Sequence, residues 1–181
     1  MTKYIKDVLI PRDEIARMCQ RLGEQISHDY AGKEVILICV LKGAYVFLAD
    51  LARHLTIPVK IDFMSVSSYG SGTRSTGVVR IVKDLDTSIT NKHIIVVEDI
   101  VDSGLTLNHL RELLSTRNPA SIALCTAFDK PDRRRVQIDV DYVGMKIPDE
   151  FIVGYGLDYD GNFRNLPDVA ILGDDSQGGE K

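Results

Sequence analysis

Apolar residues recur along this chain at two spacings, one typical of helices and the other of buried strands. Helical spacing predicts an amphipathic helix over residues 12–30, and Pro11 suits its start. The apolar positions of that helix are Ile15, Met18, Cys19, Leu22 and Ile26. Continuous apolar runs at residues 35–41 and 93–98 predict strands that are buried on both faces.

Helices and strands are predicted to follow one another along most of the chain. Helical spacing returns after Gly43, over residues 44–55, and again from Leu105 to a point before Pro119. The other predicted strands cover residues 59–67, 78–82, 121–128, 140–143, 152–154 and 169–172. Because strands alternate with helices, the sequence predicts an α/β fold with a mainly parallel central sheet.

A polar segment rich in glycine, residues 68–77, lies between two of the predicted strands. It is expected to be an exposed loop, and with its two arms it resembles a long hairpin. Gly70, Gly72 and Gly77 would make a motion of this hairpin sterically inexpensive, so we expect a mobile loop. Judged by composition alone, a glycine-rich hairpin without a function fits equally well.

Composition and charge narrow the class of protein. The chain has 181 residues, 44% hydrophobic and 27% charged, which is ordinary globular usage and predicts one domain over residues 1–172. Residues 173–181 have no apolar side chain, which predicts a flexible tail. Lys plus Arg is 22 and Asp plus Glu is 26, a net charge of −4, so nucleic acid is not an expected partner.

Neither a membrane nor secretion is indicated. The longest apolar run, residues 35–41, is far shorter than the roughly 20 residues of a membrane-spanning helix. Charged side chains near the N-terminus stand where a secretion signal would be apolar, so we expect a cytoplasmic protein. Cys19, Cys39 and Cys125 are widely spaced in apolar surroundings, which predicts buried free thiols rather than disulfides or a zinc site.

The segment over residues 96–106 carries the clearest chemistry. It follows a predicted buried strand and leads directly into a predicted helix, and ligands of open α/β sheets bind beyond the carboxyl ends of the strands. Free amides at the helix start, the close backbone approach that Gly104 permits, and the hydroxyls of Ser103 and Thr106 suit a phosphate monoester. The sequence therefore predicts a phosphate site here.

Two neighbouring acids, Glu98 and Asp99, precede this phosphate site. They suit hydroxyl groups or Mg²⁺, as a phosphorylated ribose would require. Taken alone, the pair fits solvated charges at a strand end, and Asp102 with Ser103 fits a plain helix N-cap. The whole pattern of four apolar residues, two acids, two apolar residues and Asp-Ser-Gly-x-Thr resembles the phosphoribosyl-pyrophosphate motif of the type I phosphoribosyltransferases.

The resemblance covers residues 8–172 and narrows to the 6-oxopurine branch, the hypoxanthine and hypoxanthine-guanine phosphoribosyltransferases. Residues 62–73 look like the mobile catalytic loop of the bacterial members, and residues 83–86 follow as in those relatives. The implied fold adds a small hood region to the central sheet. The implied reaction is Mg²⁺-dependent transfer of 5-phosphoribose from its 1-pyrophosphate to N9 of hypoxanthine or guanine.

The resemblance also implies the roles of the sugar-binding residues. Asp102 matches the catalytic aspartate near purine N7, which takes a proton as N9 bonds to the sugar. Glu98 and Asp99 match the pair that contacts the ribose hydroxyls, directly or through Mg²⁺, and Asp158 matches a residue that reaches a second Mg²⁺ through water. The residues that match the 5′-phosphate loop are Ser103, Gly104, Leu105 and Thr106, with Leu105 in place of the lysine of animal relatives.

Pyrophosphate and loop residues are assigned by the same resemblance. The short pyrophosphate loop is matched by Leu41, Lys42 and Gly43, a string that also fits a plain turn, and its first peptide bond can be cis in the family. Arg164 matches an arginine that approaches the pyrophosphate, which suits a planar guanidinium. The loop residues that close over the reacting centre are matched by Ser68 and Tyr69.

The purine site is implied by four residues. Lys130 matches the lysine at the 6-oxo group, and because an ammonium only donates, adenine should be rejected. Phe151 matches the aromatic that stacks on the base, although it also fits core packing, and the backbone of Ile152 would face the purine edge. The carbonyl of Asp158 would lie near the purine 2-position.

Other readings of the sequence stay open. A non-catalytic regulator that senses phosphoribosyl pyrophosphate, or a phosphoribosyltransferase that prefers xanthine, would share the same sugar motif. The basic cluster at residues 132–135 is expected to be a solvated loop or a subunit contact. The family resemblance suggests a homodimer or a homotetramer.

Overall fold

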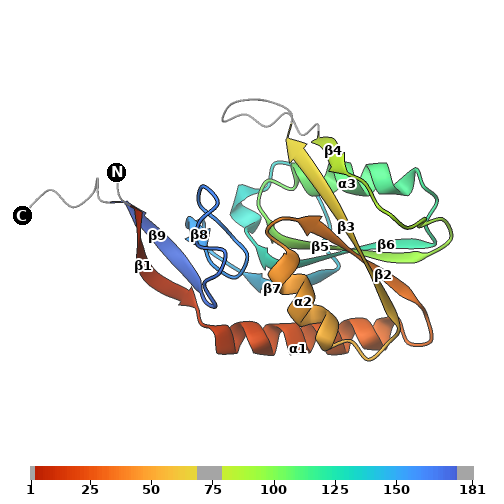
Figure 1. Cartoon of the computed structure of the whole chain (residues 1–181), viewed down its shortest axis with the longest axis horizontal. Coiled ribbons are helices and arrows are strands. Elements are labelled where there is room, and N and C mark those ends of the chain that lie inside the picture. The colour runs from red at the N-terminus through yellow and green to blue at the C-terminus, as the bar shows by residue number, and fades with distance from the viewer. Residues whose placement is uncertain (1–2, 69–78, 175–181) are drawn as a thin grey trace, which may run out of the picture.

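The computed structural model describes residues 3–68 and 79–174, which form two sheets and three α-helices (Figure 1). The strands are β1 (Lys3–Ile10), β2 (Val35–Leu41), β3 (Val59–Ser68), β4 (Val79–Lys83), β5 (His93–Val101), β6 (Ser121–Asp129), β7 (Tyr142–Lys146), β8 (Ile152–Val153) and β9 (Val169–Asp174). The helices are α1 (Arg12–Asp29), α2 (Tyr45–Arg53) and α3 (Leu105–Ser115), with a short 3₁₀ helix at Pro131–Arg133.

The larger sheet has the strand order β4-β3-β2-β5-β6-β7, and every neighbouring pair is parallel except β3 with β4. The predicted α/β fold with a mainly parallel sheet is therefore confirmed. The antiparallel pairing of β3 with β4 supplies the two arms of the predicted hairpin. Tyr69 and the glycines of that loop lie outside the described residues.

Buried side chains on both faces of the central strands explain their continuous apolar runs. Leu37 and Ile95 belong to the core beneath α1 and α2, whereas Ile36 and Ile94 belong to the core beneath α3. Since successive side chains of a strand point to opposite faces, a strand covered on both sides has no position for a polar residue. The three cysteines are free and buried, as predicted.

A second, three-stranded sheet of order β1-β9-β8 lies at one end of the molecule and corresponds to the predicted hood region (Figure 1). The sequence did not predict β1, because most of its side chains are exposed and it pairs with β9 through the backbone. That pairing includes Gly173 and Asp174, so β9 continues past residue 172, where the flexible tail was predicted to begin. Asp168 joins this sheet to α1 by accepting the Arg12 N–H at 2.8 Å.

Two further boundaries differ from the sequence predictions. Strand β7 starts at Tyr142 rather than Val140, because its pairing with β6 begins there, and Val140 packs instead against the core beneath α3. Strand β5 runs on to Val101 and therefore includes the acidic pair. Within the described ranges, no helix is long and apolar enough to cross a membrane.

A buried carboxylate, Asp62, holds the turn after β4 against β3. Its Oδ1 accepts the N–H of Phe63 at 2.7 Å, and its Oδ2 accepts the N–H groups of Asp86 and Thr87 at 3.0 and 2.9 Å. Burial by itself raises the pKa of Asp62, but these backbone donors outweigh burial and hold the pKa below its ordinary value. The charged carboxylate therefore stabilises the folded state.

Asp62→Ala should lower the free energy of unfolding at pH 7 by about 1–3 kcal/mol, because three backbone donors in partly buried hydrogen bonds lose their acceptor. Since folding lowers the pKa of Asp62, its contribution is present above an unfolded value of about 3.9 and is lost as the pH falls through the folded value. Urea unfolding of both proteins at pH 7 and at pH 3 measures this. Equal stability at pH 7 would contradict the assignment.

Candidate functional site

The loop between β5 and α3 forms a small cavity at the carboxyl edge of the central sheet. The cavity has a volume of about 160 Å³ and is lined by Glu98, Ile100, Val101, Asp102, Ser103, Gly104, Thr106 and Leu107. Gly104 has a φ of +79°, a left-handed conformation that favours glycine, and its carbonyl accepts the first helical bond from Asn108 N–H at 2.9 Å. The structure thus brings the predicted 5′-phosphate residues together at a helix start.

The acidic pair lies beside this cavity in partly buried surroundings. Burial, and then the charge of Asp99, raise the pKa of Glu98 well above its ordinary value. Burial raises the pKa of Asp99 to about 6, although the N–H of Ile100, which donates to its Oδ1 at 2.7 Å, and the charge of Arg164 act in the opposite direction. Two neighbouring carboxylates whose charged forms are disfavoured by burial suit a cation.

The predicted pyrophosphate loop lies directly against this acidic pair. It follows β2, its Leu41-Lys42 peptide bond is cis, and Lys42 is exposed. A Cβ added to Gly43 would lie 1.5 Å from Asp99 Oδ2, and a Cβ added to Gly156 would lie 2.1 Å from the Gly43 carbonyl oxygen. Glycine at both positions therefore lets the loop pack between β5 and the turn after β8.

Arg164 connects the turn after β8 to the loop before β9. Its Nη1 donates to the carbonyl oxygen of Gly156 at 2.6 Å, and its Nη2 lies 2.5 Å from Asp158 Oδ1. The other oxygen of Asp158 accepts the N–H of Gly161 at 2.7 Å. Arg164 and Asp158, which the sequence assigned to separate roles, thus form one ion pair.

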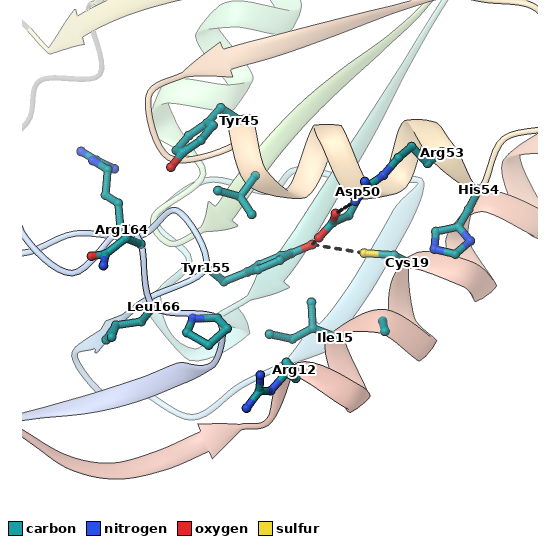
Figure 2. A pocket seen from close by; sticks show the side chains of 14 residues that line it. Arg12, Ile15, Cys19, Tyr45, Asp50, Arg53, His54, Tyr155, Arg164 and Leu166 are labelled. Carbon is teal, nitrogen blue, oxygen red and sulfur yellow. Dashed lines mark hydrogen bonds and ion pairs between the residues drawn. The ribbon is translucent and has the colours of Figure 1, made fainter.

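A larger cavity of about 470 Å³ lies between α1, α2 and the loop before β9 (Figure 2). The hydroxyl of Tyr155 donates to Asp50 Oδ2 at 2.9 Å and lies 3.3 Å from Cys19 Sγ, which ties the turn after β8 to both helices (Figure 2). Burial is the main cause of a raised pKa for both Tyr155 and Cys19. Of the predicted site residues, Arg164 alone lines this cavity.

The predicted purine residues lie at the ends of β6 and β8. Lys130 is buried, its N–H donates to the carbonyl oxygen of Val101 at 3.0 Å, and its Nζ donates to the carbonyl oxygen of Glu150 at 2.6 Å. Phe151 is 54% exposed and contacts the ring of Tyr159 edge to face, with 5.7 Å between centroids. Because the ring is exposed, the alternative that Phe151 is a core residue does not hold.

Two arginines that the sequence left as solvated loop residues contact this site. Arg133 Nε lies 3.0 Å from Asp102 Oδ1. Arg134 Nη1 donates to the carbonyl oxygens of Val101 and Asp102 at 2.9 and 2.7 Å, and Arg134 pairs with the buried carboxylate of Asp129. The sequence offered one signal, since a carboxylate at the buried end of a strand requires a cationic partner nearby.

Comparison with known proteins identifies the family. A family model described as a phosphoribosyl transferase domain matches residues 11–160. The chain belongs to the phosphoribosyl transferase family. This agrees with the resemblance that the acidic pair and the phosphate loop indicated, and it makes the protein a transferase.

Relatives of this phosphoribosyl transferase match it over nearly its whole length. The hypoxanthine-guanine phosphoribosyltransferase of Streptococcus mutans is 50% identical over 97% of both chains. The hypoxanthine phosphoribosyltransferase of Salmonella typhimurium is 48% identical over 93% of this chain and 96% of its own. The predicted resemblance to the 6-oxopurine branch is confirmed.

Solved structures agree with the fold. A crystal structure of a hypoxanthine-guanine phosphoribosyltransferase from Bacillus anthracis has a TM-score of 0.91 at 46% identity and covers 96% of this chain and 100% of its own. One of a hypoxanthine phosphoribosyltransferase from Staphylococcus aureus has a TM-score of 0.92 at 46% identity, with coverages of 96% and 94%. The type I phosphoribosyltransferase fold is confirmed.

Asp99→Asn should raise the free energy of unfolding of the unliganded transferase at pH 7 by about 1–2 kcal/mol. Folding raises the pKa of Asp99 from 3.8 to about 6, so the folded state loses stability as the pH rises between these values, and the full cost is present at pH 7. Urea unfolding without Mg²⁺ measures the difference. A less stable variant would contradict the cost of burying the Asp99 carboxylate.

Proposed function

We propose that this transferase moves 5-phosphoribose from 5-phosphoribosyl 1-pyrophosphate to N9 of hypoxanthine or guanine, giving IMP or GMP and pyrophosphate in purine salvage. The observation that carries the proposal is the pairing of β5 with β6, in which Val101 lies opposite Asp129. The next residues along the two strands are Asp102 and Lys130, so the proton acceptor for N7 and the donor for the 6-oxo group lie side by side.

The sugar phosphate would bind in the small cavity after β5. The amides and hydroxyls of Ser103, Gly104, Leu105 and Thr106 would hold the 5′-phosphate at the start of α3, whose dipole favours an anion. Leu105 brings no charge of its own. Phosphate binding should therefore depend on directed hydrogen bonds, without the lysine that animal relatives have at this position.

Mg²⁺ fits the acidic pair. Glu98 and Asp99 supply two partly buried carboxylates with raised pKa values, and Mg²⁺ in proteins takes one or two carboxylates together with water and substrate oxygens. When bound, Mg²⁺ would accept the sugar hydroxyls as ligands and neutralise charge on the pyrophosphate. Asp158 would reach a second ion through water, after a rearrangement of its pair with Arg164.

The leaving pyrophosphate would lie on the loop after β2. The backbone of Leu41, Lys42 and Gly43 and the guanidinium of Arg164 would hold it. The close approach of Gly43 to Asp99 supports a position for this loop beside the ribose. Ser68 and Tyr69 would close over the reacting centre, as the family resemblance implies, and so exclude water from an activated sugar.

The purine would lie between Phe151 and the ends of β5 and β6. Phe151 would stack on the ring, Lys130 would donate to the 6-oxo group, and Asp102 would take the proton from N7. The backbone of Ile152 and the carbonyl of Asp158 would face the purine edge, where a carbonyl accepts the amine of guanine. A homodimer or homotetramer in the cytoplasm is part of this proposal, and the three free cysteines suit a reducing compartment.

Asp102→Asn should lower kcat about 10²- to 10⁴-fold, since it removes the base, while the affinity for 5-phosphoribosyl 1-pyrophosphate stays within about twofold. Steady-state kinetics and calorimetric titration with the sugar substrate measure the two effects. Asp132→Asn, the same change at an exposed position of the 3₁₀ helix, serves as the control. Unchanged turnover would show that Asp102 is not the base that takes the proton from N7.

Lys130→Met should raise the KM for hypoxanthine about 10- to 100-fold and leave the KM for the sugar substrate nearly unchanged. The variant keeps the buried volume and removes the charged donor, whose hydrogen bond is worth about 1.5–3 kcal/mol. A thermal melt checks that the variant is folded. If the two KM values changed equally, the assignment of Lys130 to the base would be wrong.

A further inference from the structure

The three arginines of the cluster after Lys130 make different contacts. Arg134 bonds to backbone carbonyls at the end of β5 and so fixes the course of the chain. Arg135 is exposed, and its side chain has no hydrogen bond or ion pair within residues 3–68 and 79–174. Arg133 alone of the three contacts the carboxylate of Asp102.

The guanidinium of Arg133 bridges two carboxylates from different loops. Its Nε lies 3.0 Å from Asp102 Oδ1, and its Nη1 donates to Asp149 Oδ1 at 3.1 Å. The same oxygen of Asp149 lies 3.9 Å from Nζ of Lys130. A chain of alternating charges therefore joins the two groups that we assign to N7 and the 6-oxo group, which are neighbours on one edge of the purine.

The two oxygens of the Asp102 carboxylate are not in the same surroundings. Asp102 Oδ1 is shielded from solvent, and no described residue gives it a well-directed hydrogen bond. Among the described ion pairs, Arg133 is its one charged neighbour. The Asp102 side chain as a whole is nevertheless 47% exposed, so solvent reaches its other atoms. Half-exposed ion pairs add little stability, so folding does not explain this arrangement.

We propose that Arg133 is a positioning residue for the phosphoribosyl transfer, in which Asp102 takes the proton from purine N7. Through its contact with Oδ1, Arg133 orients Asp102 so that Oδ2 faces purine N7. Through its hydrogen bond to Asp149, it keeps that carboxylate close to Lys130. A planar guanidinium can span two carboxylates in this way, whereas a lysine ammonium cannot do so with the same geometry. The inference rests on the proposed roles of Asp102 and Lys130.

The first test compares Arg133→Gln with Arg135→Gln, which removes the same charge from the same loop without touching a carboxylate. We expect Arg133→Gln to lower kcat about 10-fold with the KM for the sugar substrate within about twofold, because Asp102 is misplaced rather than lost. Arg133→Lys should recover only part of this loss. Arg135→Gln should match the parent.

A double-mutant cycle separates positioning from a general structural effect. In an Asp102→Asn background, Arg133→Gln should cause no further loss beyond about twofold, because the group it positions is already inactive. The same 10-fold loss in both backgrounds, or parent kinetics for Arg133→Gln, would overturn the proposal. If Arg133→Gln fails to fold, Asp149→Asn takes its place, and parent kinetics for that variant would equally overturn it.

These outcomes are distinct from a failure of the proposed function. If Asp102→Asn itself kept full turnover, the assigned role of Asp102 would fall, whatever Arg133 did. If Asp102→Asn were inactive and Arg133→Gln lowered turnover additively, only the positioning role would be wrong.

Discussion

The burial of two neighbouring carboxylates near the end of a central strand is the constraint around which this molecule is arranged. Strand β5 lies in the middle of the sheet, so Glu98 and Asp99 cannot move into bulk water without breaking its pairing with β6. Gly43 closes one side of the pair. The unliganded site is therefore destabilised in a way that a cation or a set of sugar hydroxyls relieves, which favours binding of the substrate over stability of the free protein.

Parallel strand register then assembles the site from distant segments. The loops after β2, β5 and β6 leave the sheet at the same edge, which brings the pyrophosphate loop, the acidic pair with the phosphate loop, and Lys130 together. Phe151, which we assign to the purine, comes from the segment just before β8 of the hood sheet. No single segment is a site by itself, and the reaction depends on strand pairing as much as on any one side chain.

The sequence predicts the parts of this arrangement that are local. Helical spacing predicts α1, and the run from Glu98 to Thr106 predicts a sugar phosphate site because all of its groups lie in one contiguous segment. Contacts between loops were not predictable in this way. The bridge of Arg133 between Asp102 and Asp149 depends on the relative placement of two strand ends, and β1 lacked an apolar pattern because it is held by backbone pairing rather than burial.

The most direct test of the account is mass detection of products from 5-phosphoribosyl 1-pyrophosphate and Mg²⁺ with hypoxanthine, guanine, xanthine and adenine in separate reactions. The account predicts IMP and GMP and no AMP, because the ammonium of Lys130 can donate to a 6-oxo group but not to a 6-amino group. Fastest turnover of xanthine would favour the xanthine-preferring alternative. AMP formation at a comparable rate, or no nucleotide from any base in a protein shown to bind the sugar substrate, would contradict it.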